Sequence, residues 1–318
     1  QTPLAQGIGG TLVVAALALF GVLVADNLRR VTDMRVVTDY AWIALGSLAL
    51  LGTLGAVLLA DLSFGFLPDH RAVATAHGVI AAYGFMGMLA MGFSFILVPM
   101  FALSPPPDST LGKRSAWLGG TALVLALAGL VHGIAPLVFV AGALGLGSVA
   151  LYLRAMHKVL SGRMRKRLGD SFILIRLAWV MMPTSVVIGL LAAAGVLSDR
   201  TAPLFGFVLV FGWLLSFLMG VLQRIMPFLA SMHSVKKGVK PVLVSALTAD
   251  RPLRLHLICH CTALALVTVG ILSGESLLVR IGAAAGLIGA LSFASFAVLL
   301  WRRMRQHLNQ VTQTSEKQ

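Results

Sequence analysis

The sequence has few charged residues and very few acidic ones. Among its 318 residues, 25 are Lys or Arg and 11 are Asp or Glu, so 11% are charged, against about a quarter in a typical soluble domain. So apolar a composition excludes a soluble globular enzyme, a disordered chain and a nucleic-acid-binding domain. Its only cysteines, Cys259 and Cys261, lie two positions apart, which excludes a disulfide framework.

Long apolar stretches make up most of the chain instead. A helix needs about 20 apolar residues to cross the hydrocarbon core of a bilayer, whereas the strands of a transmembrane β-barrel alternate in polarity. We therefore predict an all-α, polytopic membrane bundle of about nine transmembrane helices. The predicted spans are 8–25, 41–60, 73–101, 116–131, 135–153, 172–197, 203–227, 255–273 and 278–300.

Basic residues are distributed unevenly between the loops. If the spans alternate in direction, nearly all Lys and Arg residues fall on one face, including the runs at 154–176 and 224–254. Basic loops resist translocation, so this face is expected to be cytoplasmic. We predict a protein of the bacterial inner (cytoplasmic) membrane with its N-terminus outside and its C-terminus in the cytoplasm. The net charge of +14 then indicates contact with the lipid bilayer, not with nucleic acid.

Two predicted spans share a pattern of glycine and proline. The third contains Gly84, Gly92 and Pro99, and the seventh repeats this spacing from Gly212 to Pro227. Both run in the same direction, which favours parallel duplication of a four-helix unit, although glycine and proline are common in membrane helices. The predicted divisions are two lead-in helices (1–72), a first four-helix repeat (73–202), a second, shortened repeat (203–301) and a polar cytoplasmic tail (302–318) that frays at its end.

Three histidines are expected at one depth near the outer face. His77 lies about one turn inside the third span, His70 just before it, and His132 at the outer end of the fourth span. Ionisable residues inside a membrane are costly, which makes them candidates for a functional site. A lone histidine that is hydrogen-bonded within the bundle is the alternative.

The segment Thr75-Ala76-His77-Gly78, followed by a glycine-punctuated span and a proline near its inner end, resembles the second helix of heme-copper oxidase subunit I. The seventh span resembles a later, symmetry-related helix of that family. Its Gly212-Trp213 pair and its ending Arg224-Ile225-Met226-Pro227-Phe228-Leu229 are similar to those of small subunit I-like proteins. The resemblance covers about residues 73–240, and NnrS-type heme/copper membrane proteins are a more distant similarity.

This resemblance implies that His77 binds heme b, because heme iron takes one or two axial ligands, usually histidine. His132 or His70 would supply the second ligand. The His-x-His pair of the oxidases is replaced here by Leu204 and Gly206, and their copper-ligand histidines are missing. We therefore expect no copper–heme binuclear centre and no reduction of oxygen.

A second group of ligand-type residues, His256, His260 and Cys261, lies at the inner end of the eighth span. Histidines four residues apart share a helix face, and imidazole and thiolate suit zinc or copper. We predict a metal site here, with His233 as a further candidate ligand. The alternative is an interfacial helix end whose polar side chains reach water or lipid phosphate.

Together these features favour an integral membrane redox subunit that carries electrons between a quinol or periplasmic cytochrome and a partner; no independent catalytic site is visible. A heme-free structural or assembly subunit of a larger respiratory complex is one alternative, and a small-molecule or metal transporter is another. Expected partners are other subunits of a membrane redox complex or a cytochrome c. Acidic residues near the outer face are either a solvated rim or candidates to dock such a cytochrome: Asp61, Asp69, Asp199 and Glu275.

Overall fold

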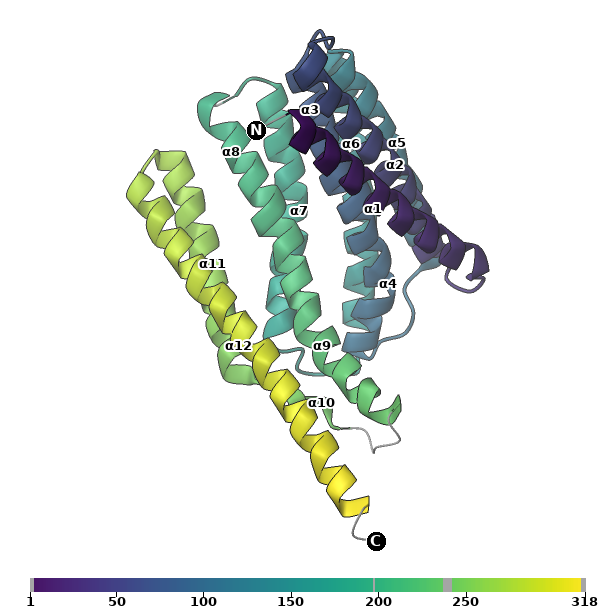
Figure 1. The fold of residues 1–318 in the computed structure, drawn as a ribbon, viewed down its shortest axis with the longest axis vertical. Coiled ribbons are helices and arrows are strands. Elements are labelled where there is room, and N and C mark those ends of the chain that lie inside the picture. Colours follow the sequence, from purple (N-terminus) through teal and green to yellow (C-terminus); the bar gives the residue numbers. More distant parts are fainter. Residues whose placement is uncertain (1–2, 197, 237–241, 316–318) are drawn as a thin grey trace. The chain divides into compact units, whose positions relative to one another are not determined.

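The computed structural model describes residues 3–196, 198–236 and 242–315. Helices joined by short loops and turns make up this part of the chain, with no strand among the described residues. Within this part of the chain, nine helices are long and apolar enough to cross a membrane. The predicted all-α, polytopic fold class is therefore confirmed. Figure 1 shows the helices in chain order.

The element bounds are as follows. The N-terminal elements are α1 (Pro3–Arg30), α2 (Arg35–Phe64), α3 (His70–Val79), the π-helix η1 (Ile80–Gly87), α4 (Met88–Ala102), α5 (Ser109–Val131) and α6 (Ala135–Ser161). They are followed by α7 (Asp170–Ala193), α8 (Ser198–Phe207), the π-helix η2 (Val208–Leu215), α9 (Ser216–Lys236), α10 (Val244–Leu247), α11 (Asp250–Ser273) and α12 (Ser276–Ser315).

The chain divides into two compact units. The first contains Gln1–Lys166 and Met182–Ser198, and the second contains Arg167–Met181 and Asp199–Gln318. Helix α7 therefore contributes its first half to the second unit and its second half to the first. The predicted divisions at 72, 202 and 301 follow sequence patterns and stay a prediction.

Several helices in this structure begin at short polar residues that cap them or end at residues with a left-handed backbone conformation. Asp69 caps α3 by accepting a hydrogen bond from Ala72 N at 2.9 Å, and Asp108 caps α5 by accepting one from Thr110 N at 2.9 Å. Such caps satisfy amide groups that the helix leaves without a partner. Leu103, with a φ of 52°, ends α4, and the three prolines at 105–107 follow it.

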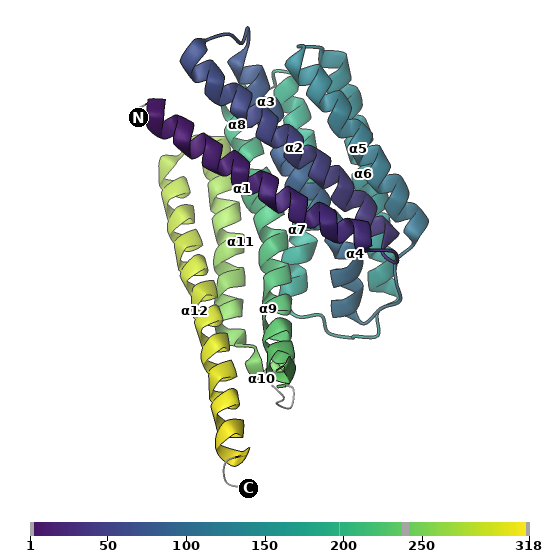
Figure 2. The same cartoon turned by 45° about the vertical axis from the view of Figure 1, so that its right-hand side comes forward.

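Close packing on α2 organises the first unit. Figure 2 shows α1 lying along α2. Tyr40 of α2 is fully buried, and its hydroxyl donates to Ser115 Oγ at 2.7 Å. Ser115 in turn donates to the carbonyl of Ser148 at 2.7 Å and links α5 to α6. Buried hydroxyl groups of this kind need such partners because desolvation is costly.

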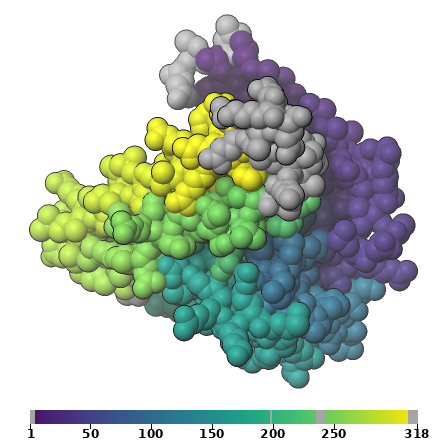
Figure 3. Space-filling model, turned by 90° about the horizontal axis from the view of Figure 1, so that it is seen from below, coloured from purple at the N-terminus to yellow at the C-terminus, as the bar shows by residue number. Residues whose placement is uncertain are grey.

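In the second unit, α11 and α12 form a hairpin that packs on α9 and α10. An apolar cluster that includes Leu247, Leu253 and Phe296 joins these helices. Figure 3 shows the yellow end of α12 against the green segment that precedes it in the chain. The end of α12 was expected to fray, but the helix continues to Ser315. The apolar packing up to Met304 and the cation–π contact of Arg305 with Trp301 support the part that follows the predicted span.

Each unit contains a π-helix at the corresponding place. The first residues of η1 and η2 are separated by the same number of residues as their last residues. Each glycine and proline of the pattern in the third span is separated from its copy in the seventh span by this same number. Gly92 packs on α2 and Gly220 packs on α7: a Cβ would lie 2.6 Å from Tyr40 Cβ at the first and 2.8 Å from the Ser171 carbonyl at the second. These contacts support duplication and place α2 and α7 in matching positions.

The α5–α6 and α11–α12 hairpins also match, but a larger interval separates them in the sequence. Gly133 and Gly274 have φ values of +66° and +80° at the two turns. The contact between Ser115 and the Ser148 carbonyl corresponds to that between His256 and the Gly289 carbonyl, at this same larger interval. The second unit therefore has a longer connection before its hairpin. Part of the sequence between the predicted spans 203–227 and 255–273 is helical: α9 extends to Lys236, α10 covers Val244–Leu247, and α11 begins at Asp250.

Candidate functional site

His77 is the sequence-predicted ligand with the clearest structural environment. It lies on α3, one turn before η1, and its ring faces Gly55 of α2: a Cβ there would lie 3.3 Å from His77 Cε1. His77 Nδ1 is buried and has no hydrogen-bond partner among the described residues. A buried imidazole nitrogen without a partner is costly, so this nitrogen marks a place where a ligand or water is needed.

The π-helix η1 begins shortly after His77, at Ile80. A π-helical turn costs more than an α-helical one and occurs frequently at functional sites. The matching position in the second unit is Phe205, which precedes η2 in the same way. The two units thus share the backbone feature, and only the first has a histidine before it.

His70 already has a partner. Its Nδ1 lies 2.7 Å from Asp61 Oδ2, and the Asp61 carboxylate also accepts a hydrogen bond from Leu67 N at 2.6 Å. These contacts join the end of α2 to the start of α3 and hold the segment that carries His77. Asp61 and Asp69 therefore have structural roles in the loop, and docking of a basic cytochrome by the acidic residues stays a prediction.

His132 is the third of the predicted cofactor ligands. It follows α5 as the residue that ends the helix, and it is exposed. Helix α5 packs against α3, which carries His77. His132 is therefore on a neighbouring helix and accessible, and its ligation of a heme stays a prediction.

His256 and His260 are both buried in the second unit, with stacked rings whose centroids are 5.7 Å apart. His256 Nδ1 lies 3.0 Å from the Gly289 carbonyl. A carbonyl can only accept, so Nδ1 carries the proton and Nε2 of the neutral ring keeps its lone pair. This Nε2 is buried and has no partner among the described residues.

His260 has the opposite tautomer. Its Nε2 lies 2.7 Å from Ser216 Oγ, and the Ser216 hydroxyl donates to the Phe211 carbonyl of η2 at 3.0 Å. Because the Ser216 hydroxyl donates its proton to the Phe211 carbonyl, its oxygen acts as the acceptor toward His260, and His260 Nε2 is the donor. The contact anchors the end of the π-helix to α11.

The structure does not gather the predicted metal ligands into one site. His256 and His260 lie together, whereas Cys261 is half-buried and both cysteines are free thiols. Among the described residues, no group of three His, Cys, Asp or Glu side chains is arranged to hold a metal ion. His233 is exposed. The metal site stays a prediction, and of its predicted ligands only His256 and His260 lie together.

Three polar residues near these sites did not enter the sequence predictions as site residues: Ser216, Gln223 and, as a partner of His70, Asp61. Gln223 could have been recognised from the sequence as a candidate site residue, because it is an uncharged polar residue in an apolar span. Ser216 and the pairing of Asp61 with His70 depend on contacts between segments, which spacing along one helix does not show.

Comparison with models of known protein families and with curated proteins found no match for this sequence.

Proposed function

We propose that the protein is a membrane redox subunit that binds heme b near its outer face through His77. The observation that supports this proposal is the buried His77 Nδ1 without a partner, on a ring that faces Gly55. A side chain at this position would crowd the ring, so Gly55 allows the imidazole to lie against α2. The residues present fit one axial ligand.

A bound heme b would supply a reversible one-electron couple. The protein residues would hold and orient the ligand side chain. Asp61, His70 and Leu67 N fix the start of α3, and η1 follows His77 directly. We propose His132 as the second ligand, since it directly follows α5, which packs against α3, and is accessible, whereas the Nδ1 of His70 is already bonded to Asp61.

We further propose the orientation, location and partners that follow from the distribution of basic residues. The N-terminus is outside, the C-terminus is in the cytoplasm, and the membrane is the inner membrane of a bacterium. Electrons pass from a quinol or periplasmic cytochrome to another subunit. Protease accessibility of tags at each end of the chain, in right-side-out membrane vesicles, tests this orientation.

The decisive experiment is heme content of purified variants. His77→Ala should lose the heme, and His77→Gly should regain its spectrum when imidazole is added, because free imidazole can replace the missing side chain. His157→Ala is the matched control, since His157 is exposed on α6. A heme spectrum that is unchanged in His77→Ala refutes the assignment.

A heme-free structural or assembly subunit is the second candidate. It is favoured by the surroundings of the two other histidines, because His70 is bonded to Asp61 and His132 is exposed at a turn. This candidate predicts a colourless protein that copurifies with other membrane subunits in mild detergent. A colourless protein that stays alone counts against it.

A further inference from the structure

A polar pocket in the second unit has no role in the proposed heme site. Its volume is about 470 Å³, within the range of small-molecule sites. It lies where three membrane helices of this unit meet: α7 and α11 begin here, with Asp170 and Asp250 in their first turns, and α9 contributes Gln223 and Arg224. Because two spans begin at this level, the pocket lies where lipid head groups lie.

The longer connection that precedes the hairpin of the second unit builds one wall of this pocket. Val244 and Thr248 come from this connection. It is held in place at several points: Arg303 of α12 donates to the carbonyl of Thr248 at 2.8 Å, and Ser231 donates to the carbonyl of Val242 at 2.6 Å. These two hydrogen bonds tie the described part of the connection to α12 and to α9.

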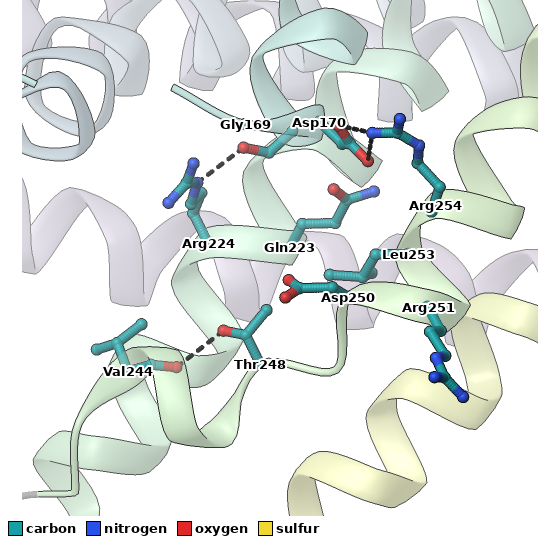
Figure 4. A pocket seen from close by; sticks show the side chains of 11 residues that line it. Gly169, Asp170, Gln223, Arg224, Val244, Thr248, Asp250, Arg251, Leu253 and Arg254 are labelled. Atoms are coloured by element: carbon teal, nitrogen blue, oxygen red, sulfur yellow. Dashed lines mark hydrogen bonds and ion pairs between the residues drawn. The ribbon is translucent and has the colours of Figure 1, made fainter. Parts of the chain in front are cut away.

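Gln223 indicates that the pocket receives a ligand. Its side chain is 3% exposed, and its amide nitrogen is buried without a hydrogen-bond partner among the described residues. Figure 4 shows this side chain extending between Asp250 and the ion pair of Asp170 with Arg254. Leaving a buried amide without a partner is costly, so a ligand that accepts a hydrogen bond from Gln223 is favoured.

The charges around Gln223 select the ligand class. Arg254 pairs with Asp170 at 3.0 Å, and Arg224 donates to Ser171 Oγ at 2.7 Å and to the Leu168 carbonyl. Arg251 points away from these groups (Figure 4). The lining holds three guanidinium groups and two carboxylates; because Arg251 is directed away, the charges left around Gln223 are those of Arg224, Arg254, Asp170 and Asp250, which balance. Such a pocket suits a zwitterion better than an anion.

The positions of the groups assign the two ends of this zwitterion. Asp250 makes no hydrogen bond or ion pair with another described residue and can accept from an ammonium group. The N-cap residue of α11 is Ala249, whose methyl side chain cannot accept a hydrogen bond from the first backbone amides of the helix. Gln223 and these amides can donate to a phosphate, because helix N-termini favour anionic groups.

We propose that this pocket binds a head group in which a phosphate and a primary ammonium are joined by a short linker, presented by a phospholipid such as phosphatidylethanolamine. The apolar residues Leu253 and Val244 at the pocket fit the glycerol and first acyl carbons. This inference is independent of heme binding, because none of the pocket residues takes part in the heme proposal.

Native mass spectrometry of delipidated protein in detergent tests the proposal. The first dioleoyl-phosphatidylethanolamine should bind about tenfold more tightly than dioleoyl-phosphatidylglycerol, and dioleoyl-phosphatidylcholine should bind weakly because its quaternary ammonium has no N–H for Asp250. Gln223→Leu and Asp250→Asn should each weaken the first binding step about tenfold, as expected for loss of one hydrogen bond to a charged group. Equal or tighter binding of phosphatidylglycerol overturns the proposal.

Two controls keep the result interpretable. Asp26→Asn removes an exposed carboxylate of α1 that pairs with Arg30 and should leave all three affinities unchanged. Every variant is compared with the unaltered protein by its thermal midpoint, and Gln223→Glu, which keeps the shape but repels phosphate, replaces Gln223→Leu if the latter unfolds. Displacement of the first lipid by millimolar O-phosphoethanolamine overturns the lipid source but supports the head-group chemistry; no displacement supports the lipid.

Discussion

Gly220→Ala should destabilise the protein because its new methyl group would meet a fixed backbone atom. The added Cβ would lie 2.8 Å from the carbonyl oxygen of Ser171 and 2.8 Å from Ile175 Cγ1. The isoleucine can rotate, but the carbonyl belongs to helix α7 and cannot move without shifting the helix. Overpacking of this kind costs about 1–3 kcal/mol, and replacing glycine in a helix recovers about 1 kcal/mol.

Gly206→Ala is the matched control, because nothing lies within 4 Å of the position its Cβ would occupy. The gain in helix propensity is common to both variants, so their difference isolates the packing cost of about 1–3 kcal/mol. For a chain of 318 residues, that corresponds to roughly 1.5–4.5 °C in the thermal midpoint. Gly92→Ala, which would meet Tyr40 Cβ at 2.6 Å, should behave like Gly220→Ala if the two units are packed alike.

The assay is thermal unfolding of the purified variants in one detergent, at one scan rate, since membrane proteins commonly unfold irreversibly. We expect Gly92→Ala and Gly220→Ala to unfold at lower temperature than Gly206→Ala. If all three unfold at the same temperature, the close approach of α4 to α2 and of α9 to α7 is wrong, and the structural support for the duplication fails.

Two further predictions concern hydrogen bonds made by side chains. The pKa of the Asp108 carboxyl is lowered because it accepts hydrogen bonds from Leu111 N and Thr110 N; it should therefore stabilise the fold fully above its ordinary pKa of 3.8 and lose this effect as the pH falls below that value. Unfolding midpoints between about pH 3 and pH 6 should show this loss in the unaltered protein and a smaller one in Asp108→Asn, and equal pH dependence in both would contradict it. Ser216→Ala should cost about 1–3 kcal/mol because His260 Nε2–H would be buried without an acceptor, whereas adding His260→Leu should recover part of that cost. A thermal midpoint of the double variant below that of Ser216→Ala would show that the hydrogen bond does not account for the effect.

The number and type of spans could be predicted from the sequence because both depend on local composition. The length of an apolar run can be compared directly with the thickness of a bilayer. Each of the nine predicted spans overlaps one helix of the described chain, although the predicted span 172–197 extends past the end of α7 at Ala193. The spacing of Gly84, Gly92 and Pro99 also indicated the repeat, because glycines that pack on a neighbouring helix recur at the positions that face it.

The contacts between helices could not be predicted in this way. The pairs His70–Asp61, His256–Gly289 and His260–Ser216 join residues far apart in the sequence or on different helices, and no spacing rule along one helix identifies such partners. The helical ends of α9 and α12 were missed because their residues are polar; contacts in the second unit, and not local composition, support them.

The same limit applies to the candidate sites. The sequence identified His77 by its motif and depth, but not Gly55, which faces its ring. It grouped Cys261 with His256 and His260 because they are close in sequence, whereas a residue next to His260 points about 100° away around a helix. The pocket around Gln223 could not be predicted, because it needs several segments of the second unit to come together.

The measurement that tests the central claim most directly is the reduced-minus-oxidised visible spectrum, with heme counted per chain in a pyridine extract, for the unaltered protein and for His77→Ala, both expressed with ample heme. The account predicts about one heme b per chain in the unaltered protein and its loss in His77→Ala. A colourless unaltered protein, or heme content that the substitution leaves unchanged, would contradict it.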